Sequence, residues 1–170
     1  MKAKPLKFFR PGRKFPLDTI PKLCYTTIRK QQGDTTMTIR FAKREDTIRI
    51  IRAIQNKHMN YNTPTHVRQD VEAGRLLVVE ENGKLLGSCA FVYKPDRGYT
   101  AVVRVCVFNQ KSRGKGVAQM LVNYVCSLGL GALGATPWND NPAMCHIFEK
   151  AGFVYQYTFQ KNYEFFLKNA

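Results

Sequence analysis

The segment with the clearest chemical potential is a glycine-rich basic turn, Arg113-Gly114-Lys115-Gly116, just before an apolar run with helical spacing. Glycines let a backbone approach a ligand closely, and amide N–H groups at the start of a helix favour negative charge. Arg113 and Lys115 add two cations. The turn is predicted to cradle a diphosphate, although a tight strand-to-helix connection accounts for the same residues. It matches neither the phosphate-binding pattern GxxxxGK nor the dinucleotide pattern GxGxxG.

A second segment, residues 141–153, carries a polar residue at the start of a helical pattern. Asn141 is followed by apolar residues at helical spacing, and the run ends in Glu149-Lys150-Ala151-Gly152-Phe153. Gly152 is predicted to end the helix. Asn141 either contacts a ligand or only caps the helix, since asparagine is a preferred N-cap residue.

Hydrophobic periodicity predicts the elements that position these two segments. Asp46 is predicted to cap the first helix, and Asn82-Gly83 predicts a hairpin because both turn residues accept a positive φ. The expected strands are 38–42, 76–80, 85–93, 99–108, 132–136, 153–160 and 163–167, and the expected helices are 46–58, 66–72, 117–128 and 143–151. This order predicts an α/β domain with a mixed sheet.

Both segments resemble the signatures of the GNAT N-acyltransferase superfamily. Arg113-x-x-Gly116-x-Ala118 is similar to the family's first pattern, and residues 141–153 are similar to its second. The expected order of elements matches as well, so the resemblance covers residues 37 to about 168. It implies the GNAT fold, with a mixed, mostly antiparallel sheet of six to seven strands, about four flanking helices, and fourth and fifth strands that splay apart.

The resemblance implies acetyl-CoA, or another acyl-CoA, as the cofactor and a primary amine as the acceptor. The amides of the turn would hold the diphosphate, and the edge of the strand that ends at Phe108 would pair with the pantetheine arm. Asn141 would contact that arm from the opposite wall, and Phe148 would pack beside the thioester. The implied cofactor-binding residues are Cys106, Val107, Phe108, Arg113, Gly114, Lys115, Gly116, Val117, Ala118, Asn141 and Phe148.

The chain departs from the family pattern in its acid and base residues. The family's usual general acid is a tyrosine where this sequence has Phe148, and the strand at 99–108 carries Arg104 in place of a carboxylate base. Arg104 either steers an anionic substrate or faces solvent. Three alternatives stay open: transfer by proximity and polarisation of the carbonyl group, a substitute acid, or acyl-CoA binding without catalysis. The candidate substitutes are Cys145, His146, Tyr163, Asp140 and Tyr93.

Charge is unevenly distributed along the chain. The 27 basic and 12 acidic residues give a net charge of +15, of which residues 1–36, with nine basic and two acidic side chains, supply +7. Four prolines in this stretch disfavour long helices and central strands, so we expect an extension at 1–36 before a domain at 37–168. The extension is either a basic arm laid on the domain or one that binds nucleic acid or an acidic partner. An acceptor linked to nucleic acid, such as aminoacyl-tRNA or a modified base, is the alternative function.

The remaining composition narrows the class of protein. Five cysteines without a CxxC pair and three scattered histidines favour neither a disulfide framework nor a metal site. Neither an apolar run of about 18 residues nor a secretory pattern is present. We therefore expect a cytoplasmic protein without a membrane span, as a monomer or a dimer.

Overall fold

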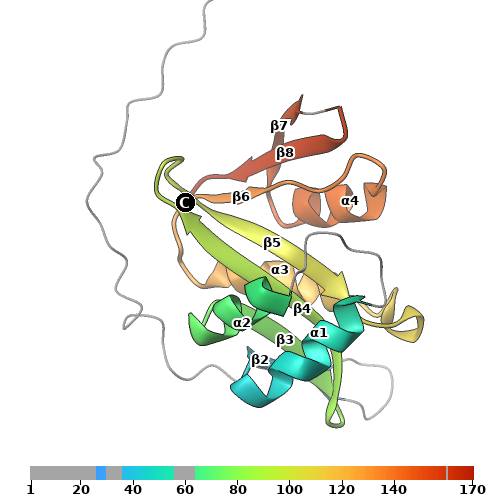
Figure 1. Ribbon diagram of the computed structural model, residues 1–170. Coiled ribbons are helices and arrows are strands. Elements are labelled where there is room, and N and C mark those ends of the chain that lie inside the picture. The colour runs from blue at the N-terminus through green and yellow to red at the C-terminus, as the bar shows by residue number, and fades with distance from the viewer. Residues whose placement is uncertain (1–25, 30–35, 56–63, 160) are drawn as a thin grey trace, which may run out of the picture.

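The computed structural model describes residues 26–29, 36–55, 64–159 and 161–170. Within these residues one mixed sheet contains eight strands in the order β1-β2-β3-β4-β5-β6-β8-β7 (Figure 1). The strands are β1 (Thr26–Arg29), β2 (Thr36–Phe41), β3 (Leu76–Glu81), β4 (Lys84–Lys94), β5 (Tyr99–Val107), β6 (Leu133–Ala135), β7 (Val154–Phe159) and β8 (Tyr163–Lys168). The helices are α1 (Thr47–Gln55), α2 (Pro64–Glu72), α3 (Val117–Ser127) and α4 (Pro142–Lys150), with short 3-10 turns η2 (Arg44–Asp46) and η3 (Gln110–Ser112).

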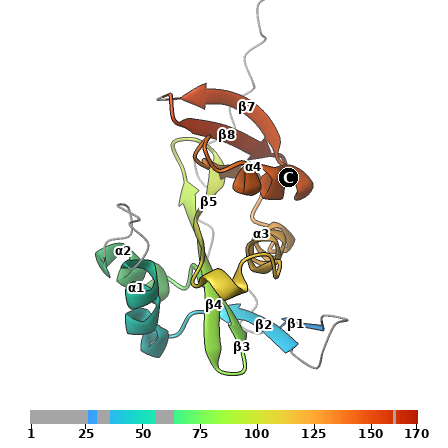
Figure 2. The ribbon, with the colours of Figure 1, turned by 90° about the vertical axis from the view of Figure 1, so that its right-hand side faces the viewer.

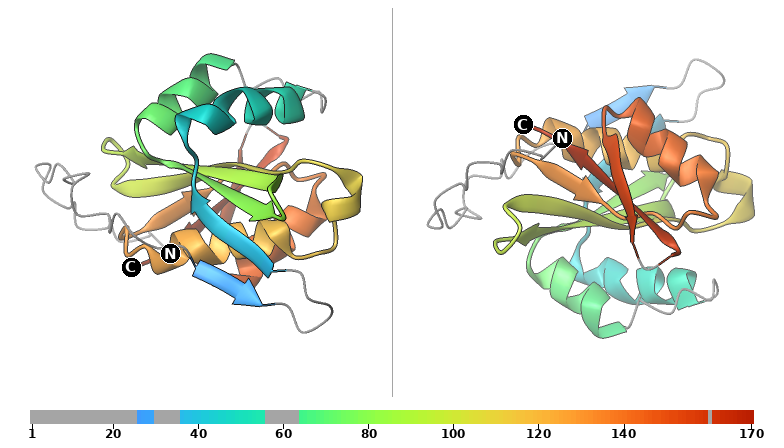
Figure 3. Two further views of the ribbon diagram at one scale, coloured as in Figure 1. Left: turned by 90° about the horizontal axis from the view of Figure 1, so that it is seen from below. Right: turned by 90° about the horizontal axis from the view of Figure 1, so that it is seen from above.

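The sheet confirms the expected GNAT fold. All neighbouring strands run antiparallel except β5 and β6, which are parallel and are connected through α3. Strands β2 to β8 are the expected seven, and β1 adds an eighth. Helices α1 and α2 cover one face of the sheet, while α3 and α4 lie on the other (Figure 3). No helix in the described part of the chain is long and apolar enough to cross a membrane.

Each face of the sheet has its own apolar core. On the α3 side, Ile39 and Leu77 from the strands pack in one cluster with Leu121 and Val125 from the helix. A second cluster lies on the α1 and α2 side and combines apolar residues of both helices with residues of β3, β4 and β5. Its members include Ile50, Ile54, Val67, Val71, Leu76, Val78, Ala90 and Cys106. Burial of both faces explains the nearly continuous apolar runs in β3 and β4.

Strand β5 extends beyond its pairing with β6, at the place where the resemblance implied that two strands splay apart. The pairing covers only Thr100–Val102 on β5 and Leu133–Ala135, which is the whole of β6 (Figure 1). Helices α1 and α2 lie on one side of β5, and α3 lies on the other (Figure 2). On its other side, β5 stays paired with β4, where the register shifts opposite Arg104. Arg104 has φ of 52°, a left-handed conformation that bulky side chains seldom adopt. The pairing with β6 thus ends before the C-terminal half of β5, and we call this gap in strand pairing the opening beside β5.

Asp46 directly precedes α1, which begins at Thr47, but its carboxylate caps the preceding 3-10 turn. Asp46 is the last residue of η2, whose N-cap residue is Lys43. Its carboxylate is buried, accepts a hydrogen bond from the Lys43 amide at 2.8 Å and forms an ion pair with Arg40 at 2.6 Å. Burial alone would raise the pKa of this carboxyl group, but the bonds from Arg40 and Lys43 outweigh it and the pKa is lowered. Asp46 therefore ties the α1 entrance to β2.

Strand β1 comes from the stretch expected to form an extension. It pairs with β2 in an antiparallel register that begins with Thr26 opposite Ile39. The domain boundary expected at residue 37 stays a prediction, and most of the basic extension, residues 1–25, lies outside the described residues. The sheet nevertheless includes five residues from that extension, the four of β1 and Thr36 at the start of β2.

Candidate functional site

The glycine-rich turn forms an uncapped helix start with open space beside it. Gly116 is the N-cap residue of α3 with φ of 81°, and it has no side chain to cap the first turn of the helix. Gly114 also has a positive φ, of 74°. A Cβ atom added at either glycine would meet no other atom within 4 Å. The backbone conformation therefore requires glycine, and the first amides of α3 are left for an external acceptor.

The loop between β5 and this turn is held by side-chain hydrogen bonds. Asn109 accepts bonds from both the amide and the hydroxyl of Ser112, each at 2.8 Å. The Phe108 amide donates to the Leu86 carbonyl at 2.7 Å, which continues the β4–β5 pairing up to the loop. Because Ser112 is buried, the turn that follows it is fixed relative to the end of β5.

Gly87 sets how closely α3 can approach the sheet. A Cβ atom at Gly87 would lie 2.6 Å from the Cys106 carbonyl oxygen and 2.8 Å from a Val117 methyl group. Val117 is the first residue of α3, so the start of the helix rests on the bare backbone of β4. Sequence reasoning missed this residue, although a glycine inside a strand pattern often marks close packing of this kind.

The two cations of the turn differ in their surroundings. Lys115 forms an ion pair of 3.4 Å with Glu81 at the end of β3. Arg113 is exposed, and the ion pairs among the described residues do not include it. Arg113 is therefore the cation whose charge is available to an anion at the start of α3.

The second sequence segment, residues 141–153, starts at the N-terminus of α4, where Asn141 was expected either to cap the helix or to contact a ligand. The Asn141 side chain accepts a hydrogen bond from the Met144 amide at 3.2 Å, so Asn141 is a helix N-cap. A ligand contact by the exposed Asn141 stays a prediction. Phe148 is only 3 % exposed, and its ring packs against those of Phe153, at 5.1 Å between centroids, and Phe166, at 6.4 Å.

The structure brings together two of the candidate acids. Cys145 is partly exposed on α4, and its sulfur lies 3.9 Å from the Trp138 carbonyl oxygen. Trp138 forms a β-bridge with Tyr163, and their rings lie 4.7 Å apart. His146 is exposed and points about 100° around the helix from Cys145. The other two candidates, Asp140 and Tyr93, are also exposed.

Glu164 is a carboxylate beside this cluster that sequence reasoning missed. It lies on β8, and its amide donates to the Pro137 carbonyl at 3.1 Å. The pKa of the Cys145 thiol is raised to about 11, first by burial, then by a hydrogen bond with the Glu164 side chain, and then by the negative charges of Glu164 and Glu149. The thiol is therefore protonated at neutral pH. No pattern in the sequence marks Glu164, since its nearest partners lie on α4 and in the loop after β6.

Arg104 takes neither of the roles expected for it. Its guanidinium forms an ion pair with the buried carboxylate of Asp70 on α2, which also binds Arg75 at 2.7 Å. The Arg104 Nε atom is buried and has no hydrogen-bond partner among the described residues. The prediction of a solvent-facing or substrate-steering charge is wrong in this structure, because Arg104 fastens α2 to the bulged part of β5.

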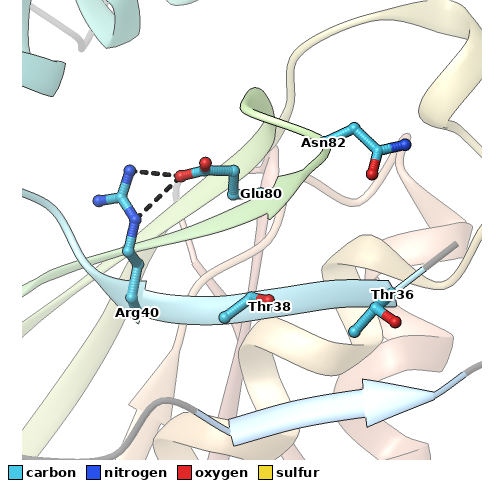
Figure 4. Close-up of a pocket in the computed structure, with 5 residues that line it drawn as sticks. All are labelled: Thr36, Thr38, Arg40, Glu80 and Asn82. Atoms are coloured by element: carbon cyan, nitrogen blue, oxygen red, sulfur yellow. Dashed lines mark hydrogen bonds and ion pairs between the residues drawn. The ribbon is translucent and has the colours of Figure 1, made fainter.

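A polar pocket lies elsewhere on the sheet. It has a volume of about 210 Å³, and Figure 4 shows its lining residues Thr36, Thr38, Arg40, Glu80 and Asn82. The Arg40 guanidinium bonds to Glu80 at 2.5 Å and to Asp46 at 2.6 Å, so its charge is neutralised. Strand β4 separates this pocket from the opening beside β5. It adds no residue to the site at the start of α3.

A comparison with protein families decides the classification. The model of the acetyltransferase (GNAT) family matches residues 40–153, which include both sequence segments together with α3 and β6. The chain belongs to the GNAT acetyltransferase family. GNAT acetyltransferases use acetyl-CoA as the acyl donor. No curated protein sequence matched the chain.

Solved GNAT structures share the fold at low sequence identity. A GNAT acetyltransferase from Bacillus cereus is 17 % identical with a TM-score of 0.69, covering 78 % of this chain and 96 % of its own. One from Streptococcus agalactiae is 20 % identical with a TM-score of 0.66, covering 79 % and 95 %. The yncA protein of Salmonella typhimurium, solved with its cofactor acetyl-CoA, is 21 % identical with a TM-score of 0.63, covering 78 % and 93 %.

Proposed function

We propose that this GNAT protein transfers an acetyl group from acetyl-CoA directly to a primary amine. The observation that carries the proposal is the uncapped start of α3, where Gly114 and Gly116 leave open space beside the first amides of the helix. This start follows the C-terminal end of β5, the part of that strand that is no longer paired with β6 (Figure 1). The family's use of acetyl-CoA and the bound cofactor in yncA support the same donor.

The residues of the cradle fit the donor's diphosphate. The Arg113 amide already donates to the Gln110 carbonyl at 3.1 Å, so backbone amides from Gly114 to Ala118 would donate to the diphosphate oxygens. The exposed Arg113 side chain would supply charge. Within this range Val117 and Ala118 are buried, so they can contribute only their backbone groups. A side chain at Gly114 or Gly116 would occupy the space that the diphosphate needs.

The walls of the opening would hold the rest of the donor. The edge of β5 at Cys106 and Val107 would bond to the amide groups of the pantetheine arm, as an added strand does. Phe108 directly follows β5, and its amide is already bonded to the Leu86 carbonyl, so it would line this edge without donating an amide hydrogen. Asn141 is exposed on the opposite wall and can still offer its amide nitrogen. Phe148 is buried in the core, so it would shape the floor beside the thioester and cannot donate a proton.

Catalysis would depend on positioning and on the amine's protonation state. The amine attacks as a free base, so it must first lose a proton to water or to a carboxylate. Holding the amine and the thioester together supplies a large part of the rate, and backbone amides can stabilise the developing oxyanion. Arg104 is a permanent cation and cannot serve as this base.

The second candidate function is acetylation of an amine carried by a nucleic acid. The net charge of +15 favours it, and so do exposed arginines on the first turns of the domain, Arg44 and Arg52. A protein of this charge attracts polyanions at a rate that falls with added salt. Arg40 and Arg104 would add little to such binding, because each is already paired with a buried carboxylate.

Two measurements separate these functions. Acetyl-CoA at about 100 times its Kd should stabilise the protein by about 2.7 kcal/mol, and a screen of amines should then reveal acetylation by mass spectrometry. Absence of any stabilisation at millimolar acetyl-CoA would contradict the proposal. Binding of RNA with a steep salt dependence, reduced by deleting residues 1–25 or by Arg44→Gln with Arg52→Gln, would favour the second function.

A further inference from the structure

The proposed reaction needs a proton donor that Phe148 cannot provide. When the acetyl group leaves, the sulfur of CoA carries a negative charge and must gain a proton. Cys145 is an ionisable residue of α4 that lies one helical turn before Phe148. The neighbouring strand β8 adds Glu164.

We propose that Cys145 and Glu164 form a proton relay that protonates the CoA thiolate in this enzyme. The inference rests on the proposed function, since it requires acetyl-CoA to bind between β5 and α4. Cys145 lies at the i−3 position relative to Phe148, so both side chains point to the same side of α4. Cys145 and Glu164 are both partly exposed, whereas Phe148 is buried.

The backbone around the pair fixes its geometry. Glu164 is anchored because its amide donates to Pro137 at 3.1 Å, and Cys145 is anchored beside the Trp138 carbonyl at 3.9 Å. The bridge between Trp138 and Tyr163 joins the same loop to the start of β8. The relay is therefore built from three segments, α4, β8 and the loop after β6, that meet at one end of the opening.

The charges around Cys145 define its role. Glu149 on its own helix and Glu164 on β8 both face the thiol, and together with burial they hold its pKa at about 11. A thiol with this pKa keeps its proton at neutral pH, so it can donate a proton but is a poor nucleophile. Direct attack on the thioester by Cys145, with an acetyl-cysteine intermediate, is not expected.

The proton balance of the relay is complete without another reactant. Glu164 accepts one proton from the acceptor ammonium, and the resulting amine attacks the thioester carbonyl. As the carbon–sulfur bond breaks, Cys145 gives its proton to the CoA sulfur and takes the proton held by Glu164. The second proton of the nitrogen passes to water, which leaves an amide, CoA thiol, one released proton and the relay in its starting state.

A protection experiment tests whether Cys145 faces the donor. Iodoacetamide should alkylate Cys145 in the free protein, and saturating acetyl-CoA should slow this at least tenfold, as measured by mass spectrometry of the peptide. Cys126, half-buried on α3, is the internal control and should react at the same rate with or without acetyl-CoA. If acetyl-CoA raises Tm but leaves alkylation of Cys145 unchanged, the relay is refuted and the proposed function stands; if Tm does not rise, the proposed function itself fails.

Variants test whether the pair acts chemically. Glu164→Gln removes a charge that raises the thiol pKa, so alkylation at pH 8 should accelerate about tenfold for each pKa unit lost. With hydroxylamine as a small acceptor, Cys145→Ala should lower kcat about 100-fold with KM for acetyl-CoA unchanged, and Cys145→Ser should recover part of it. Lys150→Gln, a charge change on the exposed side of α4, is the matched control. A Cys145→Ala protein that keeps its Tm and retains more than half of the wild-type kcat would overturn the relay.

Discussion

Placing a carboxylate at Gly116 tests the cradle most directly. Gly116 has φ of 81°, and an added side chain would enter open space rather than the protein core. The backbone strain of a non-glycine residue at this φ is about 1 kcal/mol, which for a chain of this size lowers Tm by about 2–4 °C. Gly116→Asp should therefore fold.

The cost to ligand binding should be larger than the cost to folding. A carboxylate about 5 Å from one phosphate charge costs about 3 kcal/mol at an effective dielectric constant of about 20, and screening by salt reduces this toward about 2 kcal/mol. The Kd for acetyl-CoA should rise about 30- to 200-fold. At a concentration of 100 times the wild-type Kd, the gain in stability of about 2.7 kcal/mol should fall below about 1 kcal/mol.

The assay is thermal unfolding with and without acetyl-CoA, supported by calorimetric titration. At this ligand concentration, wild-type Tm should rise by about 5–11 °C and the Gly116→Asp Tm by about 1–4 °C. Gly131→Asp is the matched control, because Gly131 also has a positive φ, of 74°, and open space but lies beyond the other end of α3. A folded Gly116→Asp protein with the full wild-type rise would refute the placement of the diphosphate.

Other perturbations test the parts that support the site. Gly87→Ala would force the start of α3 away from β4, and urea unfolding should show a loss of about 1–3 kcal/mol; a stability equal to wild type would contradict the close approach. Asp70→Asn should cost about 1–3 kcal/mol by the same assay, since it leaves the partly exposed Arg104 without its counter-charge, and Arg104→Met in the same chain should recover part of the loss. Burial raises the pKa of Cys89 to about 12 in the folded protein. As the pH rises, the thiol therefore ionises in the unfolded chain before it ionises in the folded one, and the free energy of unfolding should decline above about pH 9. The decline should be smaller in Cys89→Ala. The pKa of Asp46 is lowered in the folded protein, so its effect on stability has the opposite pH dependence. The ionised carboxylate stabilises the fold above about pH 4, and this stabilisation should be lost as the pH falls further. It should be missing in Asp46→Asn at every pH.

Local patterns predict most of the fold and the cradle. The change from alternating to helical spacing at Val117 separates β5 from α3, and the positive φ of Asn82 and Gly83 confirms the hairpin signal between β3 and β4. Gly114 and Gly116 are recognisable because two glycines among basic residues, directly before a helix, favour an anion-binding turn. These features depend on residues within a few positions of one another.

Interactions between distant residues could not be predicted in this way. Asp70 and Arg104 are 34 positions apart, and only the packing of α2 on β5 brings them together. The local pattern favours a helix cap at Asp46 because its partner Arg40 lies on a strand whose twist and register the sequence does not reveal. Glu164 has no local signal, and the prolines that precede β1 concealed a strand that forms only by pairing with β2.

The position of β1 has a practical consequence for shortened versions of this protein. A chain that starts at Met37 looks reasonable from the family match, yet it would remove the strand that covers the outer edge of β2. The amide and carbonyl groups exposed there would form a template on which a second molecule could add a strand, and such edges promote aggregation. If that shortened protein were insoluble, the result would wrongly be attributed to the missing charged arm. A chain that starts at Thr26 lacks most of the arm's charge but keeps β1 on the edge of β2.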